Sequence, residues 1–458
     1  MDATLEILRC GALVTRERMR FVGCALLVAF MLALAILAAT SHGLNDALGR
    51  PLGTDFSNVY AAGTYVREGL PQAPFDPAMQ YAREQAILGT ATPFYGWHYP
   101  PFFLFVAAAL AFLPYVPALI IWQCAAIGLY LLAIQMVLAA PTKSLGPLWP
   151  GLSRPSTPSF SLAQRNSDGR AECGNDDVDG VRSSSATVAT DPLWLLLALT
   201  FPAVFVNLGH GHNGLLTAAL FGAALAVLNR RPLLAGLLFG LLAYKPQFGI
   251  LIPLVLVTTG RWRTVAAAAG MVLALVAVTT LAFGLPVWDA FLESAHLTRV
   301  VVLESGETGW YKIQSVFAVV RMWDGSVSLA YVAQAAVTIA LAVALVWLWR
   351  LRVDFNLKAA ALIVAAILAT PYSLDYDMTA LAPAIAFLAV HGLRCGFAPW
   401  EKTALAVLWL TPLVARGVTA VILLPIGVPV MAAVLGLVLR RAAALDGYCG
   451  GGVRRNIG

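Results

Sequence analysis

Long windows without any charged side chain are the feature that most constrains how this chain folds. Asp, Glu, Lys and Arg are absent from residues 101–142, 192–229 and 325–349. A charged side chain at the centre of a bilayer costs about 3 kcal/mol or more, so such windows are typical of membrane-spanning helices. They predict an all-α, polytopic membrane protein with roughly 11 to 13 transmembrane helices, several of them short or broken by proline.

The composition of the whole chain excludes several other classes of protein. Of its 458 residues, 60% are hydrophobic and only 12% are charged, whereas about 25% are charged in an average soluble domain. These values exclude a cytosolic enzyme, a disordered protein and a secreted disulfide-rich domain. The net charge of +6 comes from Lys and Arg in short groups between apolar runs, which favours membrane lipids and not nucleic acid as partners.

These basic groups also predict the orientation of the chain. The groups at 230–231, 261–263, 350–352 and 440–441 belong on the cytoplasmic side by the positive-inside rule, together with the N-terminus. The first apolar run, 21–39, is then a retained first helix. The opposite side receives three loops richer in acidic residues, and in the large first loop we expect short interfacial helices.

One stretch leaves the predicted topology open. Residues 101–139 are too long for one helix and contain Pro114 and Pro117 near their middle. If the stretch crosses twice, the polar segment after it lies outside; if it crosses once, that segment lies inside. The segment, 141–192, is rich in Ser, Pro, Gly and Asp, and is predicted to be a disordered linker inserted within a single membrane domain, 1–458.

The first outer loop carries a carboxylate that is well placed for chemistry. Asp55 follows the first helix closely and precedes the aromatic run 56–62. A carboxylate at the membrane–water boundary can remove the proton from an acceptor hydroxyl. The same residue can also be the N-cap of the helix that follows. Asp76, which precedes Pro77, is predicted to be a turn residue.

Lys245 and Arg416 are the two charged residues inside otherwise apolar spans. An intramembrane cation requires a partner, and a lipid phosphate is a fitting partner for Lys245. Alternatively, 233–244 and 247–257 are two short helices, and Lys245 extends from the turn between them toward the interface. Pro246 favours a break at this point, because it cannot continue the helical hydrogen bonding.

Several motifs occur in an order that resembles one family. The motifs are DFSNVYAA at 55–62, GLP at 69–71, FDP at 75–77, WHYPP at 97–101, LGHGHN at 208–213, AGLLFGLLAYKP at 235–246 and PYSLDYD at 371–377. Together they resemble glycosyltransferase family 87, whose members are GT-C-type membrane enzymes typified by polyprenyl-phosphate-mannose-dependent mannosyltransferases. Two departures are His210, where the family usually has Gln, and the insertion at 141–192.

The resemblance implies an inverting hexosyltransferase that takes a sugar from a polyprenyl-phosphate carrier. Mannose is the expected sugar, and a glycolipid or polysaccharide is the expected acceptor. The resemblance further implies a bacterial inner (plasma) membrane protein whose active site faces the periplasm or exterior, with Asp55 as the general base and no cofactor. The alternative class is a polytopic transporter or flippase for a glycolipid or polyprenyl-linked sugar, which a broken helix at Lys245 would also suit.

The candidate contacts to the donor phosphate are Lys245, His98 and Arg299. Arg299 can instead form an exposed pair with Glu304, which would contribute little. His98, His210 and His212 lack the spacing of a helical metal site, so we predict that they form hydrogen bonds and that no metal is bound.

The candidate contacts to the sugar or acceptor are Tyr60, Tyr99, His210, His212, Asn213, Gln247, Tyr372, Asp375, Tyr376 and Asp377. Asn213 can alternatively cap a helix or join two helices, and Tyr372 and Tyr376 can be interfacial aromatic residues. Because Asp375 and Asp377 alternate along the chain, no more than one of them is expected to enter the site.

Overall fold

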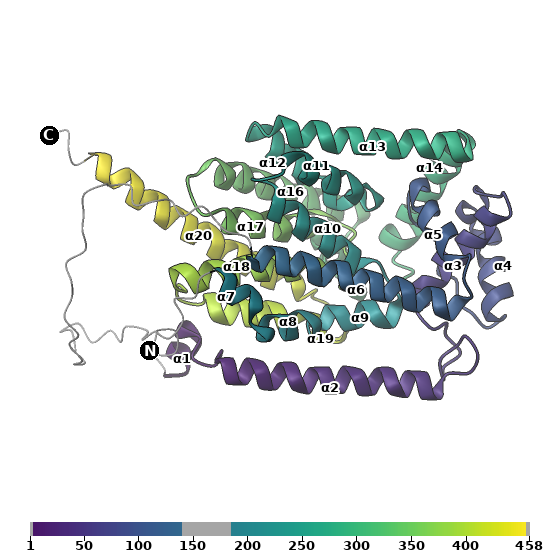
Figure 1. The fold of residues 1–458 in the computed structure, drawn as a ribbon, viewed down its shortest axis with the longest axis horizontal. Helices are drawn as coiled ribbons and strands as arrows, with labels where there is room; N and C mark the ends of the chain where they lie inside the picture. The colour runs from purple at the N-terminus through teal and green to yellow at the C-terminus, as the bar shows by residue number, and fades with distance from the viewer. Residues whose placement is uncertain (1–2, 140–184, 455–458) are drawn as a thin grey trace.

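The computed structural model describes residues 3–139 and 185–454. Within these ranges every regular element is a helix and no sheet forms, which confirms the predicted all-α fold. Figure 1 shows most of the long helices running along one common axis, as expected of a bundle that crosses a membrane.

Seven helices of the described ranges are long and apolar enough to span a membrane. They are α2 (Arg16–Thr40), α6 (Tyr115–Ala139), α13 (Trp262–Phe283), α16 (Val327–Arg350), α18 with the turn before it (Asp375–Cys395), α19 (Glu401–Ile422) and α20 (Gly427–Arg454). Together, α8 (Pro192–Leu199) and α9 (Pro202–His210) are also long and apolar enough, with a bend of 47° between them. The bend lies where Pro202 has no backbone N–H to donate. Five further apolar segments have 10–17 residues, and the predicted number of roughly 11 to 13 membrane helices is reached only when they are counted.

One of the short pairs forms a hairpin around Lys245. It consists of α11 (Pro232–Leu241) and α12 (Leu251–Thr258), with two 3₁₀ turns between them. Nη2 of Arg261, just after the hairpin, donates to Oδ1 of Asn229, just before it, at 2.9 Å. Both arms are shorter than the roughly 20 residues that cross a bilayer. The hairpin therefore enters and leaves at the same end of the bundle, and its turn lies inside.

A second hairpin is built the same way from α17 (Phe355–Ala369) and α18 (Leu381–Cys395). Asp354, which caps α17, has its Oδ2 atom 2.6 Å from Nδ1 of His391 near the end of α18. Its turn, 370–380, carries the two acidic residues of the PYSLDYD motif. The last turns of α9, before α10 (Gly214–Val227), reach the same region, since Nδ2 of Asn207 in α9 donates to the Tyr376 carbonyl at 2.9 Å.

Short helices gather at one end of the bundle, which we call the loop end. They are α3 (Thr54–Arg67), α4 (Pro77–Leu88), α5 (Leu104–Leu110) and α14 (Pro286–Thr298), and they lie opposite the N-terminus and the last turns of α20 (Figure 1). Asp76 begins α4, because its carboxylate accepts hydrogen bonds from the N–H groups of Ala78 and Met79 at 2.8 and 3.0 Å. The remaining helices are α1 (Ala3–Cys10), α7 (Ser185–Thr190) and α15 (Val316–Met322).

The stretch 101–139 crosses the bundle once. It divides into α5 at the loop end and α6, which runs to the opposite end (Figure 1). Asp191, which caps α8, pairs with Arg16 at the start of α2 at 2.5 Å, so the chain begins its next crossing from the end where α2 begins. The predicted linker, 141–192, lies outside the described residues up to 184, and α7 forms within its last part.

Gly63 allows α3 to lie directly against α5. A Cβ atom at this position would lie 2.1 Å from the carbonyl oxygen of Ala107 and 2.8 Å from the Cβ of Ala111. Both neighbours are fixed parts of helical backbone or of a short side chain, so neither can turn away. Glycine is therefore required here if α3 is to hold its place at the loop end.

We expect Gly63→Ala to destabilise the protein by about 1–3 kcal/mol, because overpacking forces the two helices apart. Thermal unfolding of the purified protein in detergent measures this as a lower Tm. Gly128→Ala is the matched control, since a Cβ atom on Gly128 meets nothing within 4 Å and Ala is the better helix former. Equal Tm values for the two variants would contradict the packing described.

Candidate active site

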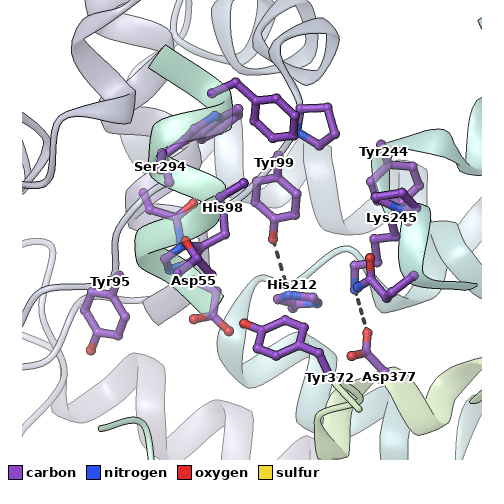
Figure 2. A pocket seen from close by; sticks show the side chains of 18 of the residues that line it. Asp55, Tyr95, His98, Tyr99, His212, Tyr244, Lys245, Ser294, Tyr372 and Asp377 are labelled. Carbon is purple, nitrogen blue, oxygen red and sulfur yellow. Dashed lines mark hydrogen bonds and ion pairs between the residues drawn. The ribbon is translucent and has the colours of Figure 1, made fainter. Parts of the chain in front are cut away.

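A cavity of about 210 Å³ lies where the loop end meets the turns of the hairpins. One wall comes from α3, the segment 95–100 and α14, and the opposite wall comes from His212 and the two hairpin turns (Figure 2). Its polar lining residues are Asp55, Asn58, Tyr95, His98, Tyr99, His212, Tyr244, Lys245, Gln247, Ser294, Thr298, Tyr372, Tyr376 and Asp377.

Asp55 points into this cavity from the first turn of α3 (Figure 2). The N-cap of α3 is Gly53, in the left-handed region at φ 67°, and no side chain caps this helix. Asp55 is therefore not the N-cap of this helix, and the alternative prediction is wrong. The carboxylate remains 23% exposed, and its Oδ2 atom lies 3.8 Å from Nδ1 of His210, which is also 2.6 Å from Oγ1 of Thr54.

The surroundings of Asp55 make it a stronger base than an ordinary aspartate. Burial raises the pKa of its carboxyl group, and the neighbouring His210 acts in the opposite direction. A carboxylate with a raised pKa binds a proton more tightly, which suits a general base at neutral pH.

The segment after α4 brings aromatic and imidazole groups to the cavity. Nδ1 of His98 lies 2.9 Å from Oγ1 of Thr298 on α14. Although His98 is exposed toward the cavity, desolvation by the protein around it lowers its pKa to about 4, so its imidazole is neutral at pH 7. The hydroxyl of Tyr99 lies 3.3 Å from Nε2 of His212, which stacks on Tyr376 with ring centroids 3.5 Å apart.

Lys245 forms a buried ion pair across the cavity wall. Its Nζ atom donates to Oδ1 of Asp377 at 2.5 Å (Figure 2), and the two side chains are 5% and 1% exposed. Oδ2 of Asp377 accepts the Leu374 N–H at 3.0 Å. The ammonium group thus has a protein partner and does not extend to a membrane interface.

The other intramembrane cation is paired in the same way. Nε of Arg416 on α19 donates to Oδ2 of Asp375 at 2.6 Å. The two acids of the PYSLDYD motif therefore compensate the two cations that sequence analysis singled out. Asp377 lines the cavity and Asp375 does not.

Four further candidates lie outside the cavity lining, among them His210, which lies beside Asp55 as described above. Arg299 pairs with Glu304 at 3.3 Å and is largely exposed. Tyr60 donates its hydroxyl hydrogen to the Leu113 carbonyl at 2.9 Å. Asn213 is buried, and neither side-chain polar atom has a hydrogen-bond partner among the described residues.

Sequence reasoning missed several lining residues. Asn58 could have been found, because it lies one helical turn after Asp55 and so shares its face of α3. Ser294 and Thr298 of α14 carried no signal, since their contribution depends on how the second loop folds over the cavity.

One set of described residues has the spacing of a metal site, and it lies away from this cavity. It consists of Asp354, His391 and Cys395. Both carboxylate oxygens of Asp354 already have protein partners. Oδ1 accepts the Asn356 N–H, and Oδ2 lies 2.6 Å from Nδ1 of His391.

This fold and cavity define a polytopic, all-helical membrane protein with a polar site enclosed between its spans and a cap of short helices. The family model for glycosyltransferase family 87 matches residues 97–371, more than half of the chain. The chain belongs to glycosyltransferase family 87, and so is a membrane glycosyltransferase that has a sugar donor and an acceptor. Comparisons with curated proteins and with solved structures find no match.

The matched range includes His98, His212 and Lys245, but it ends before Asp377 and begins after Asp55. Both acids nevertheless line the same cavity as the residues of the matched range.

We expect Lys245→Met and Asp377→Leu each to destabilise the protein by about 3–5 kcal/mol, because each leaves one buried charge without its partner. The double variant should be more stable than either single variant, since no charge is then stranded. Thermal unfolding of the four proteins in detergent forms a complete double-mutant cycle.

Arg299→Met is the control for this cycle, because the exposed Arg299–Glu304 pair should contribute only about 0–1 kcal/mol. Strictly additive losses at Lys245 and Asp377 would mean that the two charges do not depend on each other.

Proposed function

We propose that this glycosyltransferase moves a hexose, with mannose the first candidate, from a polyprenyl-phosphate carrier to a hydroxyl of a glycolipid or polysaccharide. Asp55 is the general base in this proposal: it takes the proton from the acceptor hydroxyl as the oxygen attacks the anomeric carbon. The carrier phosphate leaves from the opposite side, so the configuration at that carbon inverts.

The observation that carries the proposal is the position of Asp55. It is the acid on the loop-end wall of the cavity, its carboxylate is not used in capping, and burial raises its pKa. The His210 imidazole, 3.8 Å away, is placed to stabilise the ionised carboxylate.

Lys245 is the proposed contact to the donor phosphate. An ammonium group has three donors, and Asp377 accepts from it at one oxygen, which leaves donors for phosphate oxygens. His98 is neutral, so it can contribute a hydrogen bond but no charge. Gln247, Tyr372 and Tyr376 line the same space and offer donors and acceptors for sugar hydroxyls.

The proposed orientation places the cavity on the periplasmic or exterior side of a bacterial inner membrane. Arg230–Arg231 and Arg261–Arg263 lie at helix ends remote from α3–α5, and Arg440–Arg441 lie within α20 where it leads away from them (Figure 1). The positive-inside rule places such groups in the cytoplasm.

The direct test uses purified protein in detergent, polyprenyl-phosphate-mannose and an envelope glycolipid fraction as acceptor. We expect Asp55→Asn to lower kcat by about 10²–10⁴-fold, since an amide cannot accept the proton. Transfer of radiolabel in the absence of vesicles or a gradient also separates an enzyme from a transporter.

The matched control is Asp76→Asn on the same loop. Asn is as good an N-cap as Asp, and Asp76 does not line the cavity, so this variant should retain wild-type activity. Near-normal transfer by Asp55→Asn would disprove the assignment of the base.

The pH dependence gives an independent check. A base works only when ionised, and the pKa of Asp55 is raised by burial, so activity should fall as the pH drops through that raised value. An ordinary aspartate has a pKa of about 3.9. The pH at which kcat/KM begins to fall on the acid side should therefore lie above about 4. An unchanged kcat/KM down to about pH 4 would contradict a buried aspartate base.

A further inference from the structure

Glu84 is a buried acid of α4 that does not line the cavity. Its side chain is fully enclosed, and none of the ion pairs among the described residues includes it. A buried carboxylate without a cation is costly unless several hydrogen bonds satisfy it. The hydrogen bonds that the Glu84 carboxylate accepts must therefore offset the cost of its burial.

The carboxylate of Glu84 connects two parts of the cavity wall. Oε2 accepts the Tyr95 N–H at 3.0 Å, and Oε1 accepts the Gly96 N–H at 3.1 Å. Oε1 also accepts from Nε2 of Gln80 at 3.2 Å, and the same Nε2 donates to the Asn58 carbonyl at 3.0 Å. One acid thus joins α3, one turn after Asp55, to the segment that carries His98 and Tyr99.

The backbone conformation of this segment depends on the same contacts. Gly96 has φ 66°, in the left-handed region, and this turn presents two consecutive N–H groups to one carboxylate. Such paired N–H groups form an anion-binding concavity. After this turn, Trp97, His98 and Tyr99 all line the cavity, and Trp97 and Tyr99 are buried.

We propose that Glu84 is a positioning residue of the transfer reaction, whose carboxylate holds the 95–99 segment against α3 and so fixes His98 and Tyr99 relative to Asp55. The inference rests on the proposed function. It adds a residue that touches neither donor nor acceptor but sets the geometry of the groups that do.

The charge of Glu84 is part of this role. Desolvation raises its pKa to about 7, opposed by the hydrogen bonds from Tyr95, Gln80 and Gly96. A protonated carboxyl loses one acceptor position, and then one of the two backbone N–H groups loses its partner. The contact is thus complete above pH 7 and weakens as the pH falls through that value.

No other charged or titratable group among the described residues around Glu84 pairs with its carboxylate. The guanidinium of Arg83 turns away to Glu68 at 2.5 and 2.6 Å, and Arg50 pairs with Asp46 at 3.7 Å. Burial raises the pKa of Tyr95 to about 12, and the charge of Glu84 adds to this, so Tyr95 stays neutral in this range. Tyr115 donates its hydroxyl hydrogen to the Leu52 carbonyl at 2.7 Å. The other titratable and charged groups on the neighbouring elements make no hydrogen bond to Glu84. They are Asp55, Tyr65 and Arg67 on α3, Tyr81 on α4, and His98 and Tyr99 beyond the turn.

The test compares Glu84→Gln with wild type in two measurements. Gln keeps the volume but has one acceptor oxygen, so one backbone N–H faces an NH₂ group. In hydrogen–deuterium exchange of the full chain in detergent, the amides of residues 95 and 96 should exchange at least about tenfold faster in the variant. In wild type their protection, corrected for intrinsic exchange, should decline between pH 8 and pH 6, and in Glu84→Gln it should not. These pH limits follow from a transition about one unit either side of the pKa of about 7.

Transfer assays give the second measurement. Displacement of the lining groups should lower kcat of Glu84→Gln by about tenfold or more at pH 8, whereas Glu68→Gln, which alters only an exposed pair, should match wild type. If Glu84→Gln does not fold, Gln80→Met breaks the link to Asn58 and should lower kcat in the same direction. Its own Oε1 atom has no partner, so Met removes one unsatisfied acceptor together with the two hydrogen bonds from Nε2.

Unchanged exchange at residues 95 and 96 would overturn the contact. Faster exchange with wild-type kcat would overturn the positioning role and leave the proposed function intact. Wild-type protein that transfers no sugar from polyprenyl-phosphate-mannose would overturn the proposed function and, with it, this role, while the exchange measurement still reports on the contact.

Discussion

The ion pair between Lys245 and Asp377 is the interaction on which the interior of this protein depends. It joins the turns of two hairpins that are 132 residues apart in sequence, and both turns are irregular backbone inside the bundle. Each charge alone would be several kcal/mol less stable in this environment. Because each satisfies the other, two polar turns can meet in the middle of an apolar bundle and form one wall of a cavity.

The opposite wall is held by weaker and more numerous contacts. α3, the 95–99 segment and α14 come from three separate parts of the chain, and single hydrogen bonds such as that between His98 and Thr298 join them. A site made of a fixed wall and a wall of loops is common among enzymes, since loops adapt to substrate while the scaffold keeps the reactive groups in place. Here the proposed base stands on the loop side and the proposed phosphate contact on the fixed side.

Sequence reasoning reached the fold class because charge is so rarely tolerated in lipid. The windows without charge located the spans, and Lys245 and Arg416 stood out as exceptions. Which acid compensates which cation could not be read, because Asp375 and Asp377 are two residues apart and only the three-dimensional turn sends them to different partners. The role of Glu84 was also out of reach, since burial of an acid in a short interfacial helix leaves no periodic pattern.

The two hairpin turns have a consequence for the chemistry itself. Irregular backbone at this depth is tolerated only where protein or water satisfies its N–H and C=O groups, and the polar cavity lies directly beside the turns. Water that enters this cavity to satisfy such groups would lie, under the proposed function, beside the carboxylate that deprotonates the acceptor. Under the proposed function, hydrolysis competes with transfer unless the acceptor fills the cavity before the sugar leaves its carrier.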